Sequence, residues 1–196
     1  MSSEILHSVL TRLIALAGEA LQQDFEGIPL RLSGLHLSET WSQSPNTVFV
    51  VPHGVTLFEQ GIRSEVTRQK VADPAGGDEL YRFYRAPMPI TLHFLFVPNT
   101  DHIETDLKVL GRLYQLLHEQ PVLNEEQNEG DGGGETRQTL SADTRMTPEL
   151  LTALFQASRI SPRLSIPCLI RCQLRSDRVM REARPSRSVR GTVHRT

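Results

Sequence analysis

Apolar and polar residues alternate along residues 89–97, and a helical pattern follows at residues 101–119. In a strand, side chains two residues apart share a face. One face of segment 89–97 then carries Ile90, Leu92, Phe94 and Phe96, and the other carries Leu95 and Val97. Because both faces hold apolar side chains, the pattern predicts a strand inside a sheet that is covered on both sides.

The pattern at 101–119 predicts a long amphipathic helix. Its apolar residues recur at steps of three and four, the spacing of one helix face. This stripe consists of Ile103, Leu107, Leu110, Tyr114 and Leu117, widened by Val109, Leu113 and Leu116. We expect the stripe to be buried against one face of the sheet.

The remaining periodic segments complete an α+β fold. We expect a first helix at 4–23 with Ser3 as its N-cap, a helix starting after the N-cap Thr147 with Pro148 in its first turn, and strands at 30–37, 48–58 with a kink at 52–54, and 166–174. This element order predicts a mixed or largely antiparallel sheet covered by two to three helices.

The chain divides into one domain and one tail. A length of 196 residues suits a single domain, which we place at 1–176. Within it, 61–86 is predicted to form a protruding hairpin, and the Gly-rich segment 124–136, with five carboxylates and no basic residue, a mobile surface loop. Residues 177–196 are predicted to form an extended, Arg-rich tail.

Charge is distributed unevenly along the chain. The formal net charge is −2, but residues 178–196 carry six Arg and one Glu, which leaves −7 for the remainder. Arg178, Arg181, Arg184, Arg187 and Arg190 recur at every third residue. In a polyproline-II helix, with three residues per turn, they line one edge. Three uses remain open for such a ribbon: an acidic groove on a partner or neighbouring copy, nucleic acid, or a solvated tail.

Candidate catalytic and metal-binding residues are few. His93 with Asp101 and His102 is one possible group at the end of the central strand, whereas His102 and His118 lie about 24 Å apart on one helix. Segment 130–135 lacks the Lys and Ser or Thr of a phosphate loop. The hypothesis is therefore a non-enzymatic protein without metal or cofactor.

The two cysteines and the N-terminus bear on the compartment. Cys168 and Cys172, about 13 Å apart along one strand, are too distant for a disulfide and are expected to be buried thiols. The N-terminal residues lack the pattern of a secretory signal, and no apolar run has the length of a membrane span. We expect a protein made in the cytoplasm and not inserted into a membrane.

The order of these motifs resembles the cap, or tail-terminator, proteins of contractile injection systems, phage-tail-like particles such as the antifeeding prophage. The resemblance covers residues 4–175, and its most specific part is the strand Pro89–Val97 followed by the helix Leu107–His118 and the closing Pro121-Val-Leu123. A second match is Thr147-Pro-Glu-Leu150 leading to Arg163-Leu-Ser165. Longer members carry a further C-terminal region in place of the short tail.

The resemblance implies a structural protein that forms a ring, expected to be a hexamer, on the distal end of an inner tube and its sheath. Such a ring stops polymerisation and stabilises the extended sheath, so self, sheath and tube are the expected partners, with no nucleic acid. Assembly in the cytoplasm precedes incorporation into the particle, whether retained or released. Interface candidates are the Arg residues of the tail together with Arg63, Arg68, Tyr81, Phe83 and Tyr84 of the hairpin.

Two alternatives accompany this hypothesis. The same hydrophobic pattern suits a generic homo-oligomeric adaptor domain without enzymatic activity, because a fold does not determine a function. A small hydrolase or metal-dependent enzyme using His93, Asp101 or His102 is the other alternative.

Overall fold

The structure, a computed structural model, describes residues 2–22, 24–25, 27–34, 41–58, 66–71, 80–123, 138–174 and 179–183. Its helices are α1 Ser2–Gln22, α3 Ile103–Glu119 and α4 Pro148–Ala157. Its strands are β1 Leu30–Leu32, β2 Thr47–Leu57, β3 Thr67–Val71, β4 Leu80–Tyr84, β5 Met88–Asn99, β6 Val122–Leu123, β7 Gln138–Ala142, β8 Ile166–Leu174 and β9 Val179–Ala183. None of these helices is long and apolar enough to span a membrane.

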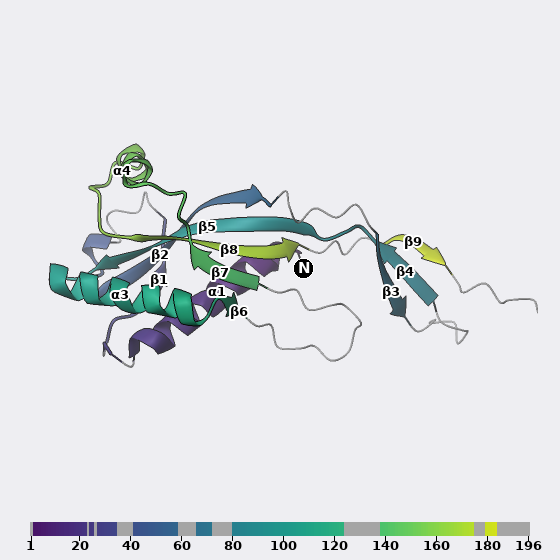
Figure 1. Cartoon of the computed structure of the whole chain (residues 1–196), viewed down its shortest axis with the longest axis horizontal. Coiled ribbons are helices and arrows are strands. Elements are labelled where there is room, and N and C mark those ends of the chain that lie inside the picture. Colours follow the sequence, from purple (N-terminus) through teal and green to yellow (C-terminus); the bar gives the residue numbers. More distant parts are fainter. Residues whose placement is uncertain are drawn as a thin grey trace, which may run out of the picture.

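Six of the strands form one mixed sheet in the order β1-β2-β5-β8-β7-β6 (Figure 1). β1 runs parallel to β2, and every other neighbouring pair is antiparallel. We call this sheet with α1, α3 and α4 the body. The predicted α+β class, a mixed sheet covered by helices, is confirmed.

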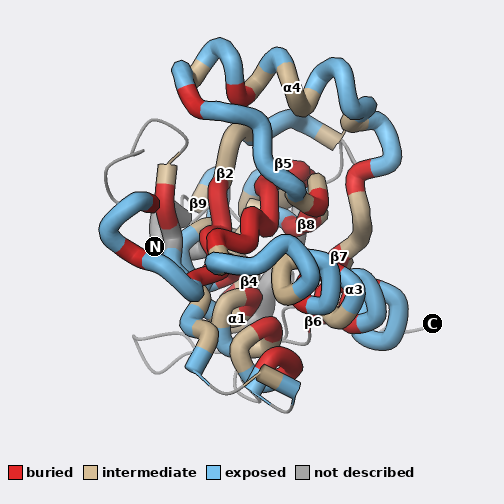
Figure 2. The backbone as a smooth tube through the Cα atoms, turned by 90° about the vertical axis from the view of Figure 1, so that its left-hand side faces the viewer, coloured by how far each residue is buried: buried red, intermediate tan, exposed pale blue. Residues whose placement is uncertain are grey.

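The central strand β5 is buried on both faces, as its pattern predicted. Phe94 and Phe96 lie in the core formed with α1 and α3, where neither ring is exposed to solvent. Leu95 and Val97 lie on the opposite face, in a second core with Trp41 and Phe155 of α4. The sheet therefore separates two helical layers, with α4 on one side and α1 and α3 on the other (Figure 2).

Helix α3 is amphipathic, but its buried arc is not centred where the spacing predicted. The residues that contact the core are Val109, Leu110, Leu113, Leu116 and Leu117. Ile103, Leu107 and Tyr114 are 60%, 56% and 51% exposed, so their predicted burial is wrong. The apolar arc of this helix is wider than the surface that the sheet covers, and its outer flank faces solvent.

Several local predictions are confirmed. The hydrogen-bond register of β2 shifts between Pro52 and Gly54, at the predicted kink. At the start of α4, the Thr147 side chain accepts a hydrogen bond from the backbone N–H of Leu150, and Pro148 occupies the first turn. Leu150, also in the first turn, is 56% exposed and therefore faces solvent although it is apolar.

The two cysteines are free and buried, as expected. Cys168 of β8 points into the core with α1 and α3. Burial raises the pKa of the Cys168 thiol well above its ordinary value, and the nearby Asp143 carboxylate acts in the same direction. This thiol therefore stays protonated and packs as a small apolar side chain.

Candidate protein interface

A second, three-stranded sheet extends from the body, and we call it the arm. It consists of β3, β4 and β9 in that order, with both outer strands antiparallel to β4. β4 continues through residues 85–87 into the start of β5, and β9 follows β8 in the chain. Figure 1 shows the arm beyond the ends of these two long strands, apart from the helices.

One face of the arm combines cationic and aromatic side chains. The register places Arg68 opposite Phe83 and Phe83 opposite Arg181, so these residues share a face of the sheet. Tyr81 joins them because it lies two residues before Phe83 on β4. The Arg68 guanidinium carbon lies 3.6 Å from the Tyr81 ring centroid, a cation–π contact. We call these four residues the cationic-aromatic face.

The other face of the arm has a different character. The Arg82 Nε donates a hydrogen bond to Glu182 Oε1 at 2.9 Å, which joins β4 to β9. This hydrogen bond raises the pKa of Arg82 above its ordinary value. Tyr84 lies two residues after Arg82 on β4, so it shares the face of Arg82 and does not belong to the cationic-aromatic face. Positive charge without a matching carboxylate is thus confined, among the described arm residues, to the face with Arg68 and Arg181.

The interface candidates chosen from the sequence are only partly brought together. Arg68, Tyr81, Phe83 and Arg181 gather on one face of the arm, and Tyr84 lies on the opposite side. The other candidates, Arg63, Arg178, Arg184, Arg187 and Arg190, lie outside the described residues, as does segment 124–136. Their role in an interface stays a prediction.

Residues 179–183 form a strand, where the spacing of the arginines predicted polyproline II. β9 pairs with β4 from Tyr81 to Tyr84, with one irregularity between Phe83 and Tyr84. A polyproline-II helix leaves its backbone N–H and C=O groups to water, whereas this strand bonds them to β4. Pairing with the available edge of β4 therefore decides the conformation of this segment, and the three-residue spacing of its arginines does not. Arg181 is exposed on this strand.

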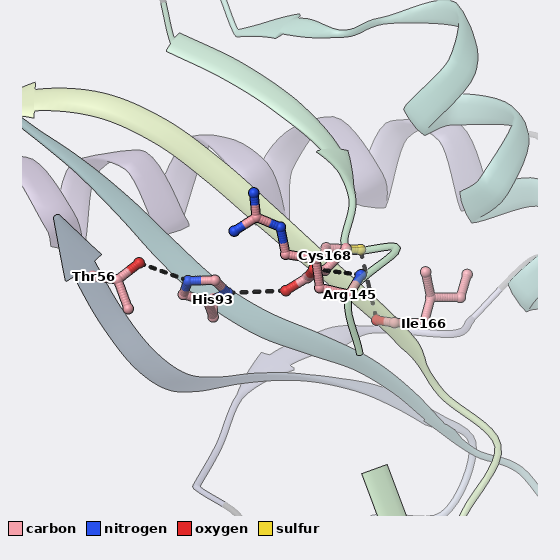
Figure 3. Close-up of polar contacts among 6 residues, drawn as sticks. Thr56, His93, Arg145, Ile166 and Cys168 are labelled. Atoms are coloured by element: carbon pink, nitrogen blue, oxygen red, sulfur yellow. Dashed lines mark hydrogen bonds and ion pairs between the residues drawn. The ribbon is translucent and has the colours of Figure 1, made fainter. Parts of the chain in front are cut away.

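The body contains a partly buried polar cluster that the sequence did not indicate (Figure 3). His93 Nδ1 lies 3.0 Å from Asp143 Oδ2, and His93 Nε2 lies 2.9 Å from the Thr56 hydroxyl. Asp143 is 6% exposed, and its other oxygen accepts a hydrogen bond from the backbone N–H of Arg145. His53 lies beside His93, with ring centroids 6.0 Å apart.

The hypothesis that grouped His93 with Asp101 and His102 is wrong. His93 lies mid-strand, opposite Gly54 and Leu169, whereas Asp101 and His102 follow the end of β5. At about 3.3 Å per residue they are more than 20 Å away along the strand. Among the residues that the structure describes, no three His, Cys, Asp or Glu side chains form a group that could hold a metal ion.

The cluster connects four strands of the sheet. Thr56 belongs to β2, His93 to β5, and Asp143 follows β7, while the Asp143 backbone N–H donates to the carbonyl of Pro167 in β8. Its order of carboxylate, imidazole and hydroxyl is that of a nucleophile triad. A triad also needs donors for an oxyanion, and no described contact of the cluster supplies them. We therefore assign these polar side chains a structural role, in which their hydrogen bonds connect neighbouring strands of the sheet.

His53 gives the folded state a dependence on pH. Burial, followed by the neighbouring His93, lowers the pKa of His53 from 6.5, while Asp143 opposes the shift. A depressed pKa means that the folded chain favours neutral His53, so this stabilisation is complete above 6.5 and is lost as the pH falls towards the depressed value. We expect the melting temperature to fall across this range, and His53→Gln to flatten the slope.

Thermal melts at several pH values check this expectation. His118→Gln, at an exposed position on α3, is the control and should retain the wild-type slope. Equal slopes for His53→Gln and the wild type would show that other groups carry the pH dependence.

Comparison with known proteins gives a consistent result. Over 96% of this chain, the fold matches the sheath/tube terminator of the extracellular contractile injection system PVC in its extended state, with a TM-score of 0.65 and 18% identity. It also matches the tube-terminating cap of the anti-feeding prophage over 91% of this chain, with a TM-score of 0.57 and 16% identity. The chain spans 62% and 59% of the length of these two proteins.

No curated protein matches the chain in sequence. A family model does: the one described as the Pvc16 N-terminal domain matches residues 9–188, which include the described part of the arm and all of the body except the first seven residues of α1. Because this match extends over most of the 196 residues, the chain belongs to the Pvc16 N-terminal domain family.

Proposed function

We propose that this protein is a structural cap, or tail terminator, of a contractile injection system. It forms a ring, expected to be a hexamer, on the distal end of the inner tube and sheath, ends their polymerisation and stabilises the extended sheath. The observation that carries the proposal is the family match over residues 9–188, together with the shared fold of two terminators. Assembly begins in the cytoplasm, and the cap then becomes part of the particle.

In this proposal the arm contacts the tube or sheath. Its cationic-aromatic face is half-buried at Tyr81 and Phe83 and exposed at Arg68 and Arg181. Aromatic and Arg side chains are the types that dominate binding energy at protein interfaces. Among the described residues of the arm, this face carries two Arg and no carboxylate, which favours an acidic protein surface as the partner. We further propose that the Arg-rich tail, whose basic character is evident from the sequence, binds the neighbouring cap or sheath subunit.

Particles from cells with and without the gene test the proposal. Without the protein we expect sheaths that are overlong, ragged or prematurely contracted in negative-stain electron microscopy, because nothing ends polymerisation or holds the extended state. Expression of the wild type, or of Leu150→Ala as a surface control, should restore uniform blunt ends. Sheaths of normal length and form in the deletion strain would refute a terminator role and leave the generic oligomeric domain.

A further inference from the structure

The outer flank of α3 is an apolar surface without a partner among the described residues. Ile103, Leu107 and Tyr114 are each more than half exposed. At 100° per residue they fall within about 40° of one another around the helix. Arg112 lies on the opposite side, where its Nε is 3.3 Å from the Ala20 carbonyl and 3.0 Å from Asp24 Oδ2 of the segment that ends α1. We call Ile103, Leu107 and Tyr114 the α3 flank, and this flank points away from α1.

A second apolar surface lies at the far end of β2. Val55, Leu57 and Met88 are 53%, 57% and 47% exposed, and we call them the β2-end patch. Val55 is opposite Leu92 in β5, and Leu57 is opposite Ile90. Residues directly opposite in an antiparallel pair share a face. Leu92 belongs to the core under α1 and α3, so the patch lies on the sheet face that carries these helices.

The edge of β2 beside this patch is open within the described part of the chain. β1 pairs only with Val48, Phe49 and Val50. Beyond Val50, no described strand pairs with β2 on that side. Natural proteins usually protect such an edge with charge or cover it, because an exposed apolar edge associates with other chains. Here the edge carries Val55 and Leu57, which indicates that it becomes covered.

The two surfaces lie on opposite sides of the body. The sheet order places the open part of β2 towards the β1 edge, while α3 packs over β5 and β7 and its flank points away from α1. Different patches on opposite sides of a subunit make a head-to-tail contact, which generates a closed ring when the rotation between copies closes.

We propose that the α3 flank of one copy packs on the β2-end patch of the next, where it extends the neighbour's layer of helices on the sheet. This assignment rests on the proposed ring and names its lateral interface. The charges around the two surfaces fit: exposed Asp101 and Glu104 adjoin the α3 flank, and exposed Arg85 lies at the same end of β5 as Met88.

The size of the contact predicts weak pairing in dilute solution. Three half-exposed large side chains contribute on the order of 300 Å² per partner, compared with the roughly 800 Å² of a typical stable interface. Ring closure and the underlying tube then supply the additional stability, because each copy is held by several contacts at once. A test must therefore trap the contact.

Disulfide trapping in the full chain tests the proposed contact between the α3 flank and the β2-end patch. The double variant Leu57→Cys/Leu107→Cys, oxidised at high protein concentration, should form a ladder of covalent oligomers. Native Cys168 and Cys172 are buried and do not interfere. Leu57→Cys mixed with Leu107→Cys should stop at a covalent dimer, because each partner has only one introduced, exposed cysteine besides the two buried ones. The control Leu57→Cys/Leu150→Cys, with Leu150 as exposed as Leu107 at 56%, should form no ladder.

The outcomes separate this inference from the proposed function. No ladder from the double variant, or equal cross-linking of each single variant with itself, would overturn the assigned surfaces even if deletion of the gene alters sheath length. A ladder with the expected dimer would support the surfaces even if sheaths form normally without the protein, in which case the terminator role alone fails.

Discussion

Phe94→Ala lowers the free energy of unfolding by about 3–5 kcal/mol, the range found when a large aromatic ring is removed from a packed core. Phe94 has no exposed surface, and its ring packs edge to face on Phe96 with centroids 5.4 Å apart. The ring lies between the sheet and the layer of α1 and α3. Truncation loses both the transfer energy of the ring and contacts that the surrounding side chains cannot restore.

Urea unfolding of both proteins measures this effect as a shift in the midpoint at constant slope. Leu150→Ala is the matched control, and we expect a change within about 0.5 kcal/mol because this side chain is largely exposed. A loss below about 1 kcal/mol for Phe94→Ala would mean that the central strand does not form the core of the folded protein.

The elements that could be predicted from the sequence are those with strong local signals. The strand around Phe94 has apolar side chains on both faces, and Thr147 followed by Pro148 marks the start of a helix. Pro52 followed closely by Gly54 marks a break in β2. In each case the structure is determined by interactions among residues close in the sequence, so a local sequence pattern is enough to predict it.

Helix α3 shows where local periodicity stops being sufficient. Its apolar residues cover a wide arc, and the sequence does not distinguish the part that faces the sheet from Ile103, Leu107 and Tyr114, which face solvent. The boundary depends on how the sheet and α1 pack on the helix, which is a property of the tertiary structure. An apolar residue in an amphipathic pattern can serve either a core or an interface.

Pairings between distant segments were not predictable. Strand β7 has a single large apolar side chain, Leu140, so neither the strand nor Asp143 after it gave a signal. The ion pair between Arg82 and Glu182 joins residues 100 positions apart. The residue types of the arm suggested an interface, but the shared face of Arg68 and Arg181 depends on the register of β4 with two strands, which no local pattern specifies.

Reversing the charge of the cationic-aromatic face should abolish capping. In Arg68→Glu/Arg181→Glu, two carboxylates replace the guanidinium groups that we propose to face an acidic tube or sheath surface. We expect binding to purified tube and sheath to weaken roughly a hundredfold, because attraction is replaced by repulsion at a desolvated contact. Particles assembled with this variant should be overlong or contracted, as in the deletion strain.

Two further variants isolate the cause. Arg68→Gln/Arg181→Gln loses the same contact with Tyr81 but adds no negative charge, so we expect a smaller loss of binding. Lys108→Glu/Arg145→Glu makes the same change in net charge at exposed positions of the body and should bind as the wild type does. Equal losses for the arm and body variants would indicate a general effect of net charge. Full binding by Arg68→Glu/Arg181→Glu would exclude the arm as the contact with the particle, because a docked basic face cannot accommodate two added carboxylates without a cost.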